Sequence, residues 1–270
     1  MRLQGKVAFI TSAQHPCARA IALGFARDGA HCVIGDEDVG LAEKLAADIR
    51  SLDRRSLALQ FDAAKKSSVQ EAARRAVAEF GRIDVLLNCS GATHEGDFLG
   101  FTEESFNQCL ERGPKAYFLV SQAVGRQMAE QRSGKIINLS TTDARVGSGE
   151  STGNSVAYSS IDAMTRAIAQ ALGFYGVNVN SLVCGPLEDN TLTREEVGER
   201  VRRMPVGRLA RPEDLVGAAI FLATADSNFV SGESLFVDCG YSNAAVTEDG
   251  FRPAWAKVWG RFEIPANKSS

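Results

Sequence analysis

Several features that would mark a secreted, membrane or nucleic-acid-binding protein are missing from this sequence of 270 residues. No apolar run approaches the roughly 18 residues that a membrane span needs. The first residues, Met1 to Thr11, have no cationic stretch followed by an apolar segment, so we expect no signal peptide. The formal net charge of −3 does not indicate a nucleic-acid-binding surface. We therefore predict a cytoplasmic protein that binds neither membranes nor nucleic acid.

Cysteine and histidine occur without the patterns typical of disulfide frameworks or metal sites. The six cysteines contain no CxxC pair: they are Cys17, Cys32, Cys89, Cys109, Cys184 and Cys239. A disulfide framework would be unusual at this length, so we expect reduced thiols, in keeping with the cytoplasm. His15, His31 and His94 lie far apart in the sequence, and isolated loop histidines are more often solvated than paired on a metal. We predict no metal site.

What the sequence does contain is a regular alternation of short apolar runs and longer helical patterns. The runs expected to be strands are Lys6–Thr11, His31–Gly35, Leu57–Phe61, Val85–Asn88, Lys135–Ser140, Val177–Val183 and Ser234–Val237. Helical stretches such as Leu41–Ile49 and Ser68–Phe80 separate them. This order predicts an α/β fold with a doubly wound, Rossmann-like parallel sheet and helices on both faces. With no repeat and no linker, we expect one domain over residues 1–241 and a C-terminal tail over 242–270.

A doubly wound sheet also predicts where a site should lie. Ligands bind beyond the carboxyl ends of the strands, where the strand order reverses. The expected site therefore includes Thr11–Ala18, Asp36, Asp62, Asn88–Gly91 and the residues that follow the fifth and sixth strands.

Several segments resemble landmarks of the short-chain dehydrogenase/reductase family. The opening LQGKVAFIT is one, and LLNCSG, IINLS and VNVNSLVCGP follow the fourth, fifth and sixth expected strands. The run PVGRLARPEDLVGAAIFLATADSNFVSGESLFVDCG is another, so the resemblance extends from about Leu3 to Tyr241. It implies the family fold, an NAD-dependent alcohol dehydrogenase or ketone reductase activity, and a tetramer built through the last strand and long helices.

The phosphate loop departs from the family pattern. The family has Thr-Gly-x-x-x-Gly-x-Gly here, and this chain has Thr-Ser-Ala-Gln-His-Pro-Cys-Ala at Thr11–Ala18. Ser12, Pro16 and Ala18 thus replace the three glycines that allow the tight turn and the close approach to the pyrophosphate. Pro16 also has no N–H to donate to a phosphate. We expect NAD to bind weakly or not at all, the alternative being a rearranged loop that still binds it.

Other positions match the family's NAD site. Asp36 ends the second expected strand, where the family uses an acid to bind the adenosine ribose and to prefer NAD over NADP. Asp62 matches the aspartate beside the adenine, and Asn88 and Gly91 match the Asn-x-x-Gly motif. As simple loop or cap residues, the two aspartates would equally be typical of turns.

The catalytic Tyr-x-x-x-Lys pair of the family is changed to Tyr158-x-x-x-Asp162. Residues four apart share a helix face, so the charge beside the tyrosine is reversed. At about 6 Å and an effective dielectric near 20, each unit charge contributes roughly 3 kcal/mol, so the total change is several kcal/mol against tyrosinate. We predict that Tyr158 stays protonated, able to donate a hydrogen bond but poor as a base.

Two further catalytic positions of the family are altered. The catalytic serine aligns with Thr141, which keeps a hydroxyl, and Ser140 and Thr142 are alternatives because the following loop is longer than usual. The catalytic asparagine aligns with Gly113, and Pro114 directly after it predicts that the helix breaks or restarts there.

The tail past Ser242 lies outside the resemblance and is rich in large apolar residues, namely Phe251, Trp255, Trp259, Phe262 and Ile264. Such residues are typical of interface anchors, so we expect the tail at a subunit interface rather than on its own subunit.

Three classes of function follow from the altered motifs. The first is a non-catalytic subunit in a hetero-tetramer with an active relative. The second is an active, divergent NAD(H)-dependent oxidoreductase, homo-tetrameric in the manner of the family, that uses Tyr158 and Thr141. The third is a non-redox enzyme on the same fold, like the related halohydrin dehalogenases, although those keep a cation where this chain has Asp162. The first class fits the losses best.

Overall fold

The computed structural model describes residues 1–89, 91, 96–147, 151–188 and 192–243. Within them, seven strands form one parallel sheet in the order β3-β2-β1-β4-β5-β6-β7. The strands are β1 (Val7–Thr11), β2 (His31–Asp36), β3 (Ser56–Gln60), β4 (Val85–Asn88), β5 (Gly134–Thr141), β6 (Val177–Cys184) and β7 (Ser234–Val237). The order reverses between β1 and β4, which places the topological switch point at the ends of these two strands.

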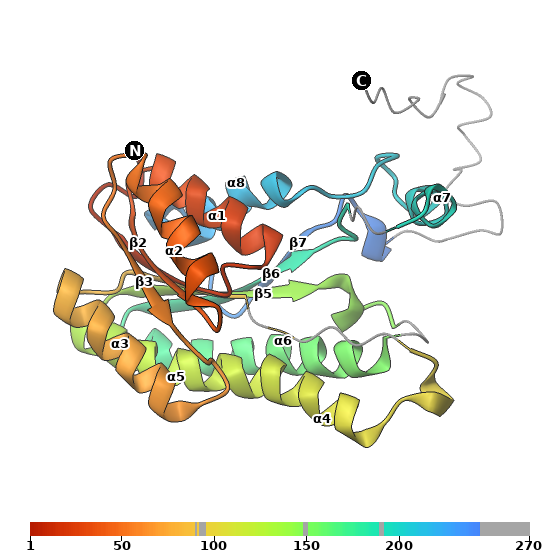
Figure 1. Ribbon diagram of the computed structural model, residues 1–270, viewed down its shortest axis with the longest axis horizontal. Coiled ribbons are helices and arrows are strands. Elements are labelled where there is room, and N and C mark those ends of the chain that lie inside the picture. The colour runs from red at the N-terminus through yellow and green to blue at the C-terminus, as the bar shows by residue number, and fades with distance from the viewer. Residues whose placement is uncertain (90, 92–95, 148–150, 189–191, 244–270) are drawn as a thin grey trace.

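Helices cover both faces of the sheet (Figure 1). One layer holds α1 (Pro16–Arg27), α2 (Val39–Arg50) and α8 (Val216–Ala223). The other holds α3 (Lys66–Phe80), α4 (Glu103–Leu110), α5 (Ala116–Gln131) and α6 (Thr152–Gly173). A π turn over Glu111–Lys115 joins α4 to α5, and α7 (Arg194–Arg202) lies apart from both layers. The short 3-10 turns are Phe98–Gly100, Thr142–Ala144, Pro212–Leu215, Ala225–Ser227 and Tyr241–Asn243.

The strands form where the sequence has continuous apolar runs, because a parallel sheet between two helix layers buries both faces of each strand. All five residues of β1 and all four of β4 are buried. The alternating sides of these strands belong to two separate cores. Ile10 and Leu87 pack with α1, α2 and α8, whereas Phe9 and Leu86 pack with α3 and α5.

The predicted fold class is confirmed, with strand ends within two residues of those expected. The strand β5 runs to Thr141, one residue further than expected, and ends beside Cys184 of β6. No helix in the described ranges is long and apolar enough to cross a membrane. All six cysteines are among the described residues, and all are free thiols. The division into a domain and a tail stays a prediction, because residues 244–270 lie outside the described part.

Candidate functional site

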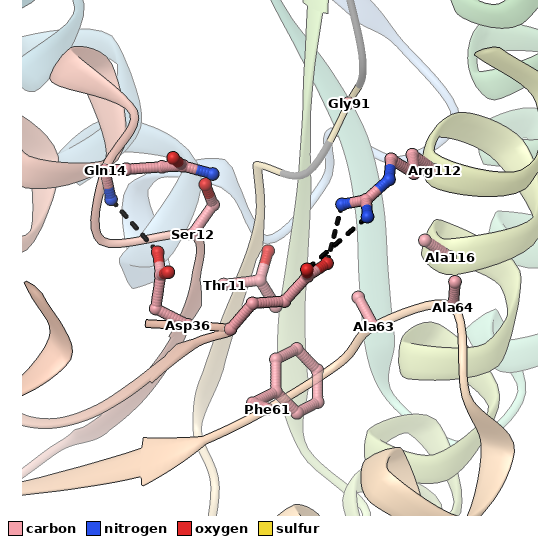
Figure 2. A pocket seen from close by; sticks show the side chains of 11 residues that line it. Thr11, Ser12, Gln14, Asp36, Phe61, Ala63, Ala64, Gly91, Arg112 and Ala116 are labelled. Carbon is pink, nitrogen blue, oxygen red and sulfur yellow. Dashed lines mark hydrogen bonds and ion pairs between the residues drawn. The ribbon is translucent and has the colours of Figure 1, made fainter. Parts of the chain in front are cut away.

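A small cavity of about 50 Å³ lies at the carboxyl ends of β1, β2, β3 and β4, where the topology places the site (Figure 2). Its lining consists of Thr11, Ser12, Gln14, Asp36, Glu37, Phe61, Ala63, Ala64, Gly91, Arg112 and Ala116. Three of the predicted cofactor residues, Ser12, Asp36 and Gly91, are thus brought together. Asp62 and Asn88 do not line the cavity.

The altered phosphate loop turns sharply even without its glycine. Ser12 has φ +64°, in the left-handed region that favours glycine, and its N–H donates to the carbonyl of Gly35 at 2.8 Å. At the start of α1, His15 is the N-cap, and its Nδ1 accepts a hydrogen bond from the Cys17 N–H at 3.2 Å. Pro16 occupies the first helical position and offers no N–H. The first turn of α1 therefore directs fewer free donors toward a phosphate than a glycine-rich loop would.

Side chains fill the region behind this loop. Cys17, Cys89 and Cys184 come from the start of α1 and the ends of β4 and β6, and they are at most 3% exposed. They belong to one core cluster with Ala13 and Ala18 of the loop. The sequence favoured small apolar filling over a thiol site, and this packing agrees. The misfit to the pyrophosphate of a dinucleotide lies in the loop itself, where Ser12, Pro16 and Ala18 stand at the glycine positions and Pro16 offers no N–H.

Asp36 lines the cavity and also holds the adjoining loops. One carboxylate oxygen accepts a hydrogen bond from the Gln14 N–H at 3.1 Å, and the other accepts from the Asp38 N–H at 2.9 Å (Figure 2). The residue is buried. Its carboxylate links the phosphate loop to the start of α2. Because both carboxylate oxygens already accept hydrogen bonds, fewer lone pairs remain for ribose hydroxyls.

Asp62 makes contacts typical of an aspartate in a turn. Its carboxylate accepts from the Ala64 N–H at 3.0 Å and pairs with Lys65 at 2.8 Å. Partial burial alone would raise its pKa, but the Lys65 and Ala64 hydrogen bonds outweigh burial and lower the pKa.

Asn88 begins a buried chain of polar side chains. Its Nδ2 donates to Asn138 Oδ1 at 2.8 Å and to Ser121 Oγ at 3.0 Å. Asn138 donates in turn to Thr165 at 2.8 Å, and the Thr165 and Ser181 hydroxyls are 3.0 Å apart. This polar chain joins β4, β5 and β6 to α5 and α6.

Tyr158 lies on α6 and is buried. Its hydroxyl faces Gly91, since a Cβ atom on that glycine would lie 3.0 Å from the hydroxyl oxygen. The pKa of Tyr158 is raised first by burial and then by the nearby Cys89 and Asp143. The pKa of Tyr158 is therefore shifted upward, as predicted, and Tyr158 stays protonated as a hydrogen-bond donor.

The expected cause of that raised pKa was wrong. We attributed it to the Asp162 charge, but burial dominates. The Asp162 carboxyl group lies beside the hydroxyls of Ser140 in β5, Ser181 in β6 and Ser234 in β7. Burial raises the pKa of Asp162 more than these hydroxyls and Arg166 lower it. Its Oδ1 is buried and has no hydrogen-bond donor among the described residues.

The three hydroxyl candidates after β5 occupy different environments. Thr141 is half-buried, and its Oγ1 accepts a hydrogen bond from the Asp143 N–H at 3.3 Å, which caps the following 3-10 turn. Ser140 and Thr142 are buried, and the Ser140 hydroxyl lies beside the Asp162 carboxyl group. Thr141 is therefore the most accessible of the three.

Gly113 lies at a kink rather than at a break between helices. Its φ and ψ of −89° and −107° are non-helical, and the π turn carries the chain past Pro114 into α5 without a loop. A Cβ atom on Gly113 would lie 3.2 Å from the Cβ of Ala157, so a larger side chain here must push against α6. The kink expected from Pro114 thus lies one residue earlier, at Gly113.

Sequence reasoning missed the two oppositely charged residues of this site and its apolar lining residues Phe61, Ala63, Ala64 and Ala116. Glu37 and Arg112 both line the cavity and form an ion pair with N–O distances of 2.6 and 3.4 Å. His15 was expected to be solvated and is a helix cap, His31 lies at the opposite end of β2, and His94 falls outside the described residues. In the described part of the chain, no group of three or more His, Cys, Asp or Glu residues could hold a metal.

Comparisons with known proteins agree with this architecture. Residues 13–242 match the family described as Enoyl-(Acyl carrier protein) reductase. The chain is 34% identical over 248 residues to the (2S)-[(R)-hydroxy(phenyl)methyl]succinyl-CoA dehydrogenase subunit BbsD of Thauera aromatica, covering 89% of this chain and 97% of the relative. It is 29% identical to the 3-oxoacyl-[acyl-carrier-protein] reductase FabG of Thermotoga maritima, covering 89% and 99%.

A solved structure gives the same result. A short-chain type dehydrogenase/reductase from Mycobacterium marinum superimposes with a TM-score of 0.83 at 25% identity, covering 88% of this chain and 96% of that one. The sheet order and the site at its switch point define a Rossmann-like α/β protein. The chain belongs to the short-chain dehydrogenase/reductase family, whose members are oxidoreductases that typically use NAD(P) and often form oligomers.

Proposed function

We propose that this chain is a non-catalytic subunit that supports an active, related subunit of an NAD-dependent alcohol dehydrogenase or ketone reductase. The observation that carries the proposal is the phosphate loop. His15 caps the first turn of α1, Pro16 removes a donor, and Cys17 packs into the core with Cys89 and Cys184. A free enzyme that depends on a dinucleotide needs glycines and free backbone donors in this loop, whereas a supporting subunit does not.

The catalytic positions support the same proposal. The ammonium group that the family uses beside its tyrosine is replaced by the carboxyl group of Asp162, whose pKa is raised by burial. The phenol of Tyr158 is held protonated by burial. At Gly113 there is no side chain to pass on a proton. Without a group that lowers the tyrosine pKa, proton transfer at neutral pH loses its driving force.

A relative adds support for a subunit role. The Thauera aromatica protein is named as a dehydrogenase subunit, and its substrate is an acyl-CoA thioester with a secondary alcohol. We extend this to the present chain as a partner of a related subunit in a hetero-tetramer. The aromatic tail over 244–270 is a candidate contact surface, and it lies outside the described residues.

Purification from the native organism tests the proposal. We expect a related subunit of similar mass to co-purify, and truncation after Ser242 to weaken that association. In a calorimetric titration, the isolated chain should bind NADH more weakly than micromolar or not at all. A stable homo-oligomer that co-purifies with nothing and turns over an alcohol or ketone would refute the proposal.

A second candidate is an active, divergent NAD(H)-dependent oxidoreductase. It is favoured by the two hydroxyls that persist, those of Tyr158 and Thr141. The variant Asp162→Lys separates the two candidates. Under our proposal it gains no dehydrogenase activity, because the phosphate loop and Gly113 are unchanged. Clear turnover by this single variant would establish that the rest of the cleft is competent.

A further inference from the structure

The Glu37–Arg112 ion pair joins two walls of the cavity that are 75 residues apart in the sequence. Glu37 lies between β2 and α2, and Arg112 lies in the π turn between α4 and α5. Both side chains line the cavity, and their ion pair links the residue after β2 to the π turn. Any ligand large enough to span the space from Asp36 to Ala116 meets this pair.

Other charges around the cavity hold the pair in place. Lys65 interacts electrostatically with Glu37, and Asp62 with Arg112. Lys65 and Asp62 are themselves paired at 2.8 Å. Each side chain of the Glu37–Arg112 pair is about half exposed, at 50% and 51%, so one such pair alone would be weak. Within a network of alternating charges, the same pair is better defined in geometry.

We propose that the Glu37–Arg112 ion pair is a latch that disfavours the entry of dinucleotides into this cavity. The proposal rests on the proposed function, since it describes how a supporting subunit leaves the cofactor to its partner. A nucleotide that enters must separate two N–H···O contacts. Both side chains then lose their counter-charge.

The decisive variant removes the pair without changing the net charge. In Glu37→Gln/Arg112→Gln, one negative and one positive charge disappear together. The matched control is Glu111→Gln/Lys115→Gln, which removes another 2.6 Å ion pair from the same π turn whose residues do not line the cavity. We expect the first variant to bind NADH about two- to fivefold more tightly than the wild type, and the control to match the wild type.

Ionic strength provides an independent measurement. Salt screens an exposed ion pair and so weakens the latch of the wild type. As salt is added, the NADH affinity of the wild type should therefore rise, or should fall less than the affinity of the latch variant falls. Equal affinities and equal salt slopes for the wild type and the latch variant would overturn the latch. Micromolar NADH binding by the wild type would overturn the proposed function, and a further gain in the latch variant would still support the latch.

Discussion

Two buried polar regions contain residues from the same turn of α6, Asp162 in one and Thr165 in the other, and their hydrogen bonding differs. In the polar chain of Asn88, Asn138, Thr165 and Ser181, successive side chains are joined by hydrogen bonds of 2.8 to 3.0 Å. Three residues before Thr165, Asp162 has a buried carboxylate oxygen without a donor in the described residues.

The difference separates positions that maintain the fold from a position that the family uses for chemistry. The polar chain links three central strands to two helices, so it stabilises the sheet whether or not the protein is an enzyme. Asp162 occupies the lysine position of the family motif, and its partly satisfied carboxyl group costs stability. Substitutions in the two regions should therefore change stability in opposite directions.

The largest effect is expected for Asn138→Ala. This change removes the acceptor for Asn88 and the donor to Thr165, and it leaves buried polar groups unpaired. We expect the free energy of unfolding to fall by about 3 kcal/mol in a urea titration. Asn107→Ala, at an exposed position of α4, is the control and should change it by less than about 0.5 kcal/mol. Similar losses for the two variants would mean that the polar chain does not stabilise the fold.

Asp162→Asn should raise the free energy of unfolding, and by less than Asn138→Ala lowers it. Because the folded pKa of Asp162 is raised, the wild type loses stability as the pH rises from the unfolded pKa near 4 through the folded pKa. The amide does not ionise, so the variant should be more stable by about 1 kcal/mol at pH 7. The advantage should vanish at a pH below both pKa values. Urea titrations at several pH values measure this, and a loss of stability at pH 7 would contradict it.

Ser12→Gly extends the comparison to the phosphate loop and should have the smallest effect. Ser12 has a positive φ that glycine adopts without strain, but glycine also gains conformational entropy in the unfolded chain. These two effects partly cancel, so we expect the free energy of unfolding to rise by no more than about 0.5 kcal/mol, as measured by thermal unfolding. Ser12→Ala keeps the strain and loses the hydroxyl, and it should be no more stable than the wild type. An alanine variant more stable than the glycine variant would mean that the turn is not strained.

Much of the fold could be predicted because its signals are local. Apolar runs such as His31–Gly35 place strands, and parallel strands bring their carboxyl ends to one edge. That rule alone located Ser12, Asp36 and Gly91 at one cavity. The kink near Pro114 was also predictable, since proline removes a helical hydrogen bond.

The remaining features depend on contacts between distant segments. Nothing in the sequence marks Glu37 and Arg112 as partners, because charged residues are common at helix ends and these two lie far apart along the chain. The cause of the raised Tyr158 pKa was missed for a related reason. A charge four residues away is visible in the sequence, whereas the burial that dominates arises from the packing of Tyr117 and Ile161 around the ring.

The thiol packing behind the phosphate loop has an evolutionary consequence. Cys17, Cys89 and Cys184 now belong to the main core, with Ala13 and Ala18 against them. Of the three positions that hold glycine in the family, only Ala18 is buried in this core, whereas Ser12 is half-buried and Pro16 is exposed. Restoring glycine at Ala18 would remove a buried methyl group and destabilise the fold, while the other two positions could revert without opening a core cavity. In evolution, the loss of stability on regaining the loop is therefore concentrated at one position, and the order in which the three glycines return decides when the fold has to absorb it.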